Sequence, residues 1–299
     1  MPAEVLLSHN DVLKAEGQKL RKTFFISDVH HDDVDFRRRD VFGNTGEQLM
    51  KTFLAEVRAW PAREKFEFHL VILGDFWNST AFMAEGFRES GELLEDIWDA
   101  FDLVTVIAGN HDIRLQGCSS LGYAESLAMR ELGIMAEHGH RLDRAWNEKG
   151  ILNGWIGEHI IKAGDRIETR WPMFDDRVMG LASRLFLPKG GRMADKPYEA
   201  EAIAMAETFP HFRLYLYGHT HRAWYRRFRV HVEGRQPKLI TLANLNAWVP
   251  SVKNHPCGWY GRNEVAPYVF IWESDIFARI DACGLEAMRP PDAREVKVG

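Results

Sequence analysis

Residues 103–112, LVTVIAGNHD, run through apolar and β-branched positions and then end on an amide, an imidazole and a carboxylate. A short run of this composition that stops at a glycine is typical of a buried β-strand. Two earlier segments, TFFISDV at 23–29 and FHLVILGD at 68–75, have the same form and also finish with polar residues. Because a polar group beside a buried strand needs a partner, the three strand ends are the first candidates for a functional site.

A helical pattern separates the first two of these strands, and this alternation favours an α/β fold. Thr45 and Gln48 fit a capping box, and apolar residues recur at helical spacing from Leu49 to Trp60. From residue 213 the pattern changes to strands in close succession, at 213–218, 223–232, 238–244 and 267–274. The second half is therefore expected to be more antiparallel than the first.

The chain of 299 residues, 45% of them hydrophobic, is expected to form one domain over residues 22–285. A stretch at about 144–210, rich in aromatic and apolar residues, is expected to be a helical insertion. It is either a lid over an acyl or nucleotide substrate or a set of extra helices packed into the core. Residues 286–299 are charged and contain proline, and we expect them to form a mobile tail.

Composition limits the classes of function. The formal net charge of −5 and the pI near 6.2 argue against general nucleic-acid binding, which needs a basic surface. No apolar run approaches the roughly 20 residues of a membrane span, and the N-terminal segment lacks the basic start and apolar core of a signal peptide. The cysteines form no C-x-x-C pattern. We therefore expect a cytoplasmic protein, with peripheral membrane contact only through the insertion, and the sequence does not indicate an oligomeric state.

Residues that can bind metal follow the apolar runs in order along the chain. They are Asp28 and His30, Asp75, Asn110, His111 and Asp112, His138 and His140, and His219 and His221. An open α/β sheet builds its site at the carboxyl ends of its parallel strands. Residues two apart in an extended segment point to the same side, so each D-x-H or H-x-H pair can face one point.

Carboxylate, imidazole and amide oxygen together form the donor set of a borderline divalent metal, and the lack of cysteine in the set disfavours a structural zinc site. The set is large enough for two ions. A carboxylate shared by two metals about 3.5–4 Å apart is the arrangement that activates water for in-line attack on phosphorus. The sequence therefore predicts a two-metal centre.

The series D-x-H, GD, GNHD, H-G-H and GHTH, spread over residues 28–221, resembles that of the calcineurin-like metallophosphoesterase family. The resemblance implies a four-layer α/β/β/α metallophosphoesterase sandwich around a dinuclear site. One metal would be held by Asp28, His30 and His221 and the other by Asn110, His138 and His219, with Asp75 as the bridge. His140 remains an alternative to His138 as a ligand.

The expected reaction is hydrolysis of a phosphoester or phosphoanhydride bond by a hydroxide that bridges the metals. Asn110 offers a neutral oxygen to a metal, whereas His111 stays free to act as a cation or general acid beside the phosphoryl group, oriented by Asp112. Arg222 and Asn78 are candidate substrate contacts. The two divalent ions are expected to be Mn²⁺, with iron, zinc, cobalt and nickel as alternatives.

The substrate is expected to be small and either phosphorylated or nucleotide-containing. The layout is similar to the UDP-2,3-diacylglucosamine pyrophosphohydrolase branch, through the insertion and the later Asn246-Ala247-Trp248. The best-known group of that branch carries arginine at the place of His111 and H-G-D at the place of His138-Gly139-His140. An enzyme of lipid A synthesis is therefore the second candidate, and a non-catalytic metal-binding scaffold is the third.

Overall fold

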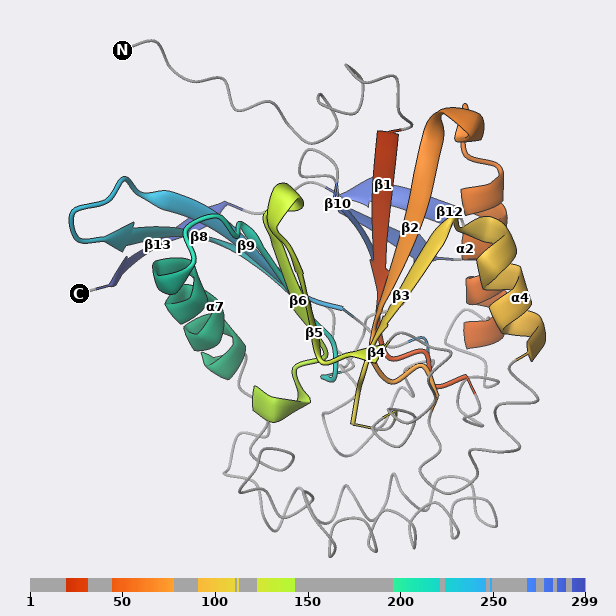
Figure 1. Cartoon of the computed structure of the whole chain (residues 1–299), viewed down its shortest axis with the longest axis horizontal. Coiled ribbons are helices and arrows are strands. Elements are labelled where there is room, and N and C mark those ends of the chain that lie inside the picture. Colours follow the sequence, from red (N-terminus) through yellow and green to blue (C-terminus); the bar gives the residue numbers. More distant parts are fainter. Residues whose placement is uncertain are drawn as a thin grey trace, which may run out of the picture.

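Two mixed β-sheets pack face to face in the computed structural model of the chain (Figure 1). The structure describes residues 20–31, 45–77, 91–110, 112, 123–142, 196–220, 224–245, 248, 268–272, 277–281, 284–288 and 292–298. Within this part of the chain the first sheet has the strand order β12-β11-β10-β1-β2-β3-β4. The second sheet has the order β13-β8-β9-β7-β6-β5.

The elements have the following bounds. The first sheet contains β1 (Leu20–Ile26), β2 (Phe66–Leu73), β3 (Leu103–Ile107), β4 (Tyr123–Ala124), β10 (Tyr268–Trp272), β11 (Phe277–Asp281) and β12 (Gly284–Met288). The second contains β5 (Ser126–Met129), β6 (Ile134–Glu137), β7 (Leu214–Tyr217), β8 (Trp224–Val232), β9 (Lys238–Asn244) and β13 (Ala293–Val298). The α-helices are α2 (Gly46–Arg58), α4 (Gly91–Ala100) and α7 (Lys196–Thr208), and the 3-10 helices are η2 (Arg63–Lys65), η4 (Arg130–Leu132) and η5 (His140–Leu142).

Three buried clusters separate four layers, because each strand sends alternate side chains to opposite faces. On β1, Phe24 and Ile26 pack against α2 and α4, whereas Phe25 packs against the second sheet. On β7, Leu214 and Leu216 face the first sheet, whereas Tyr215 and Tyr217 belong to the cluster beneath α7. The layers are therefore helix, sheet, sheet and helix, as expected, and Figure 1 shows α2 and α4 on one outer side and α7 on the other.

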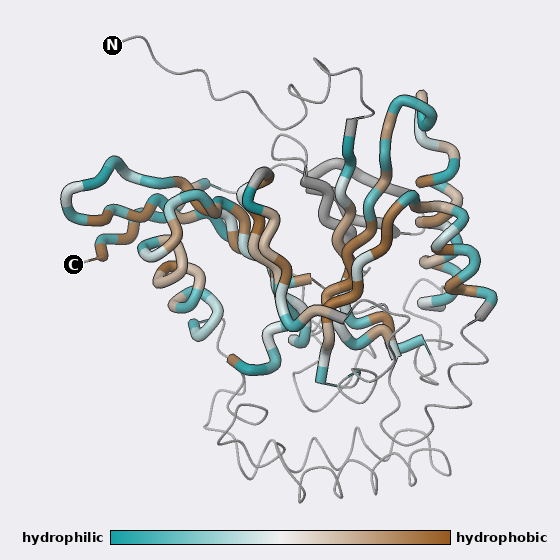
Figure 2. Tube along the Cα trace, in the orientation of Figure 1, coloured by the Kyte–Doolittle hydropathy of each residue, from teal (hydrophilic) through white to brown (hydrophobic). Residues whose placement is uncertain are grey.

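Hydropathy follows these layers. Figure 2 shows hydrophobic segments concentrated where the strands of the two sheets face each other, and hydrophilic residues at the turn between β8 and β9. Helix α2 presents an apolar face to the core, with Leu49, Met50, Phe53, Leu54 and Val57 buried. Its predicted capping box is confirmed, since the Gln48 N–H donates to Thr45 Oγ1 at 3.1 Å and the Thr45 N–H donates to Gln48 Oε1 at 2.9 Å.

Parallel pairing brings the carboxyl ends of the first strands to one edge. Strand β1 pairs with β2 in parallel from Leu20↔Phe66 to Ile26↔Ile72, and β2 pairs with β3 in parallel. In the second sheet β6, β7 and β9 run in parallel, whereas β8 pairs with β9 and β5 pairs with β6 in the antiparallel direction. The second sheet is thus mixed. The expected antiparallel character of the second half holds for β8–β9, for β10, which returns to pair with β1, and for the pairs β10–β11 and β11–β12.

The C-terminal residues differ from expectation. We expected residues 286–299 to form a mobile tail, but Ala293–Val298 form β13, which pairs in parallel with β8. Val296 and Val298 alternate with charged residues and pack against the cluster beneath α7, so this strand has an apolar face of its own. Strand β12 also extends to Met288.

The predicted helical insertion lies mostly outside the described residues. Of the range 144–210, the structure describes 196–210, which contains α7. No helix in the described ranges is long and apolar enough to cross a membrane.

Phe24 tests the core between β1 and the helices. Its ring lies 5.2–6.1 Å from the rings of Phe53, Trp60, Phe68 and Phe101. We expect Phe24→Ala to lower the free energy of unfolding by about 3–5 kcal/mol, because it leaves a cavity among these rings. Urea denaturation measures the loss. Trp98→Ala is the control, since 54% of Trp98 is exposed, and a loss there as large as at Phe24 contradicts the assignment of this core.

Candidate metal centre

The loops that follow the central strands are joined to one another by backbone hydrogen bonds. The Asp28 N–H donates to Gly74 O at 3.1 Å, and the His30 N–H donates to Asp75 O at 3.0 Å. On the second sheet, the Gly218 N–H donates to His138 O at 3.0 Å. The ends of β1, β2, β6 and β7 therefore hold their polar side chains in one place.

Two groups of buried ligand-type side chains share Asp75. The first consists of Asp28, His30 and Asp75, and the second of Asp75, His138 and His219. Within each group the ligand atoms all lie within 4.8 Å of one another, and every member is buried. A carboxylate common to two groups is what a bridging ligand requires. These clusters fit a dimetal site.

Asn110 lies beside His138, a member of the second group. His138 Nε2 is 3.1 Å from Asp75 Oδ2 and 3.0 Å from Asn110 Oδ1. The other ring nitrogen, Nδ1, lies 2.7 Å from Leu73 O, a carbonyl that can only accept. The Leu73 carbonyl thus selects the tautomer with its proton on Nδ1, which leaves the Nε2 lone pair for a metal.

His140, the alternative ligand, lies outside both groups. Its ring centroid is 5.5 Å from that of His138 and 6.3 Å from that of His219. Burial, together with the charges of His138 and His219, lowers the pKa of His140 to about 3. The geometry therefore favours His138 over His140 as the ligand.

The proposed ligands hold strained backbone conformations. Among the described residues, five that are not glycine have positive φ, and four of these are Asp28 (51°), His30 (47°), Asp75 (51°) and His219 (68°). Such conformations cost about 1–3 kcal/mol each and persist only where the surroundings impose them. The inter-loop hydrogen bonds impose them here, and this concentration of strain at one point indicates a functional site.

Two glycines allow the loops to approach so closely. A Cβ on Gly109 would overlap the Asp75 carboxylate, and a Cβ on Gly218 would overlap Ser27 Oγ and the Asp28 carboxylate. The glycines of GNHD and GHTH are therefore needed because any side chain would occupy the space of a ligand.

The Asp28 carboxylate is also held by its neighbours. It accepts hydrogen bonds from the Ser27 hydroxyl and, at 2.9–3.1 Å, from the His219 N–H. Farther out, Asn244 Oδ1 accepts from the Thr220 hydroxyl at 2.7 Å, and Asn244 Nδ2 donates to Gly218 O at 2.9 Å. The roles of Ser27, Thr220 and Asn244 could not be predicted from the sequence, because single hydroxyl and amide residues carry no distinctive spacing.

Asp112 has a role that the sequence did not predict. Its carboxylate accepts from the Asp75 N–H at 2.5 Å, the Gly109 N–H at 3.1 Å and the Trp77 N–H at 3.3 Å. Burial, and then the charge of Asp75, raises the pKa of Asp112. Asp112 therefore links the GD loop to the GNHD loop through these hydrogen bonds. Its expected effect on His111 falls on a residue outside the described part of the chain.

The buried carboxylates of the centre favour a positive charge close to them. Burial lowers the pKa of His138, but the carboxylates of Asp75 and Asp28 outweigh it and raise this pKa to about 10. Buried carboxylates that draw a proton onto an imidazole also attract a divalent cation to the same place.

Comparison with known proteins agrees with this geometry. The profile of the calcineurin-like phosphoesterase family matches residues 21–223, which covers most of the chain. The chain belongs to the calcineurin-like phosphoesterase family. No curated protein matches the sequence.

Several solved structures are similar to this chain at low identity. Vps29 from Entamoeba histolytica complexed with Zn²⁺ is 14% identical with a TM-score of 0.40, covering 89% of this chain and 97% of that one. A dimetal phosphatase from Danio rerio is 12% identical with a TM-score of 0.39, covering 90% and 96%. A cold-active protein-tyrosine phosphatase from a Shewanella species is 14% identical with a TM-score of 0.34, covering 90% and 80%.

The structure brings together six of the seven predicted metal ligands: Asp28, His30, Asp75, Asn110, His138 and His219. The seventh, His221, lies outside the described residues, as do His111, Arg222 and Asn78. Their predicted roles remain predictions.

Asp75→Asn tests the bridge. We expect it to weaken binding of both ions by roughly tenfold or more, because one carboxylate belongs to two coordination shells and its charge also reduces repulsion between the ions. His30→Gln and His138→Gln should each weaken mainly one ion. Equilibrium dialysis against Mn²⁺ with elemental analysis measures both occupancies, and loss of the same single ion in Asp75→Asn and His30→Gln contradicts a bridging role.

Metal binding should release a proton from His138. A pKa of about 10 means that this imidazole is protonated at pH 7 without metal, whereas a ligand must be neutral. The affinity is therefore expected to rise with pH between 6 and 8, by about tenfold per pH unit for one released proton. Calorimetry in buffers of different ionisation enthalpy counts the protons. His138→Gln should release one fewer, and an equal count in both proteins contradicts the assignment.

Proposed function

We propose that this protein is an enzyme that hydrolyses a phosphoester or phosphoanhydride bond at a dinuclear metal centre. The observation that carries the proposal is the pair of buried ligand groups that share Asp75. A structural metal site needs one closed set of ligands, whereas two sets around one carboxylate suit the activation of water against phosphorus.

Each residue has a separate part in this proposal. One ion would be held by Asp28, His30 and His221, the other by Asn110, His138 and His219, and both by Asp75. The two ions, when bound, supply Lewis-acid activation of water and neutralise charge on the phosphoryl oxygens. The chain itself orients the ligands, through the Leu73 carbonyl on His138 and the Ser27 hydroxyl on Asp28.

His111 is the proposed acid. It directly follows Asn110, and it is assigned to donate a proton or a hydrogen bond to the phosphoryl group or the leaving oxygen. Arg222 directly follows the last H-x-H pair and is the proposed contact to a second anionic group of the substrate, with Asn78 after the GD loop as a further contact.

We propose manganese as the activating metal. The donor set mixes carboxylate and amide oxygen with imidazole nitrogen, a combination that admits Mn²⁺ and also iron, zinc, cobalt and nickel. Elemental analysis of protein purified without chelator identifies the metal that the cell supplies. Fewer than one metal per chain after reconstitution counts against a dinuclear centre.

The proposed substrate is a small phosphorylated or nucleotide-containing molecule. The test of the reaction is metal-dependent release of nitrophenol from bis-p-nitrophenyl phosphate and from the monoester, beside cleavage of a nucleotide-sugar diphosphate. Cleavage of the diphosphate at a much higher kcat/KM than either ester supports the pyrophosphohydrolase alternative. No turnover of any of the three at full metal occupancy supports the scaffold alternative.

The adjacent variants His111→Gln and Asp112→Asn distinguish a residue that acts in the reaction from one that holds the metal site together. We expect His111→Gln to keep both metals and to lose roughly 10²–10⁴ fold in kcat, since a positioned acid or donor acts in the transition state. Asp112→Asn should instead lower metal content and thermal stability, because its carboxylate accepts N–H groups from Asp75, Gly109 and Trp77.

The two variants are compared by steady-state kinetics, elemental analysis and thermal unfolding. A smaller loss in His111→Gln for nitrophenyl esters than for alkyl esters indicates proton donation to the leaving group. Loss of a metal in His111→Gln, or full activity on every ester, contradicts the assignment of His111.

A further inference from the structure

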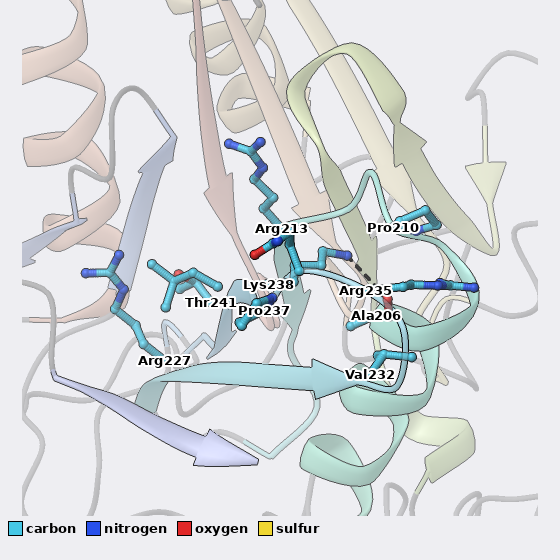
Figure 3. Close-up of a pocket in the computed structure, with 11 residues that line it drawn as sticks. Ala206, Pro210, Arg213, Arg227, Val232, Arg235, Pro237, Lys238 and Thr241 are labelled. Carbon is cyan, nitrogen blue, oxygen red and sulfur yellow. Dashed lines mark hydrogen bonds between the residues drawn. The ribbon is translucent and has the colours of Figure 1, made fainter. Parts of the chain in front are cut away.

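A pocket of about 410 Å³ lies on the second sheet, where β9 begins and α7 ends (Figure 3). Arg213, Arg227, Arg235 and Lys238 line it together with apolar side chains that include Pro210 and Leu239. We call it the basic pocket. Its volume is within the range of small-molecule sites.

The basic pocket concentrates positive charge on an acidic protein. Four of its lining residues are cationic and none is a carboxylate, although the whole chain has a net charge of −5. Burial, together with the charge of Arg213, lowers the pKa of Lys238 to about 8. The pocket is therefore a region of positive potential that an anion would stabilise.

Helix capping explains only part of this charge. Lys238 Nζ donates to Phe209 O at 3.1 Å, and Arg235 donates to Glu207 O at 2.8 Å, so both bind carbonyls at the C-terminal end of α7. Lys238 Nζ also donates to Ala206 O at 3.5 Å, so its ammonium keeps one of three donors, and the Arg235 guanidinium keeps four of five. Arg213 is exposed, and none of these helix bonds involves it. In Figure 3 Arg213 and Arg227 lie farther from α7 than Lys238 and Arg235 do.

Apolar surface lies beside the cations. The exposed large hydrophobic residues in the described ranges are Trp98, Leu103, Phe209 and Leu239. Leu239 lines the basic pocket, and Phe209 lies next to it, since its carbonyl accepts a hydrogen bond from the Lys238 ammonium. Cations next to exposed apolar side chains suit a ligand that combines an anionic group with an apolar one.

The basic pocket is separate from the metal centre. Strand β9 lines the pocket from Lys238 to Thr241, and Asn244 at the metal centre lies about 10 Å beyond Thr241 for an extended chain. None of the pocket residues belongs to the two ligand groups.

We propose that the basic pocket is a second ligand site, which binds a small molecule carrying a phosphate-like or carboxylate group attached to an apolar group. Arg213 and Lys238 bind the anionic group, and Leu239 and Pro210 contact the apolar group. The ligand occupies this site while the metal centre is free to act on its substrate.

The probe is phenylphosphonate, which has a dianionic group on an aromatic ring and a P–C bond that phosphoesterases do not hydrolyse. We expect the protein loaded with Zn²⁺, which is diamagnetic, to bind the probe at two sites. Residue-resolved NMR shifts at the metal centre and at the basic pocket report the two binding events. Asp75→Asn should weaken binding at the metal centre and keep the basic-pocket site. The basic-pocket site is expected to bind the probe even if the proposed enzymatic activity, and with it the proposed function, is absent.

Variants of Arg213 test the pocket itself. Arg213→Gln should weaken the pocket site about threefold and Arg213→Glu about tenfold or more, because the exposed cation is first removed and then reversed. Both should retain hydrolysis of nitrophenyl esters and normal thermal unfolding. Arg58→Gln on α2 is the matched control and should bind as the wild type does.

Three results overturn the proposal. They are the absence of any pocket-localised shift at millimolar probe, binding that disappears entirely in Asp75→Asn, and equal affinity in Arg213→Glu and the wild type. Inorganic phosphate and benzoate, titrated separately, distinguish the anionic groups: tighter binding of phosphate assigns a phosphorylated ligand, and tighter binding of benzoate assigns a carboxylate.

Discussion

Asp75 lies where the two ligand groups meet, and most features of the site follow from placing one carboxylate there. Its backbone accepts from the His30 N–H and donates to Asp112, so both its position and its orientation depend on loops from other strands. The side chain must then reach His138 on the opposite sheet. These requirements explain why residue 109 is glycine and why the backbone of Asp75 takes a positive φ of 51°.

This arrangement stores unfavourable energy at the site and relies on the rest of the fold to hold it. Four strained residues at about 1–3 kcal/mol each are a substantial fraction of the stability of an ordinary domain. The three hydrophobic clusters between the layers supply the opposing stabilisation. A divalent cation adds to it, because it would neutralise the carboxylates that otherwise hold a proton on His138.

The sequence was most informative where local pattern and chemistry coincide. Strands β1, β2 and β3 have long apolar runs, and a ligand-type residue follows each of them, so both the strands and the Asp28, Asp75 and Asn110 positions were predictable. The separation of His138 from His140 was not, because two histidines around one glycine look alike until the Leu73 carbonyl selects one. The role of Asp112 was missed for a similar reason, since its three N–H partners come from two loops. Strand β13 was mistaken for a tail because its sequence is rich in charged residues, and its apolar residues pack against β8 and the cluster beneath α7, which are far away in sequence.

Strand β1 is synthesised long before several of the segments that it contacts in the folded protein. Strand β1 lies between β2 and β10, and the Asp28 carboxylate receives the N–H of His219, 191 residues later. At ordinary translation rates of about 5–20 residues per second, Asp28 leaves the ribosome roughly 10–40 s before that partner exists. During this interval one edge of β1 is open to pairing with other chains. The contacts that complete this sheet and the metal centre thus join distant parts of the chain, a topology that predicts slow folding and a nascent N-terminal half that is exposed to pairing with other chains.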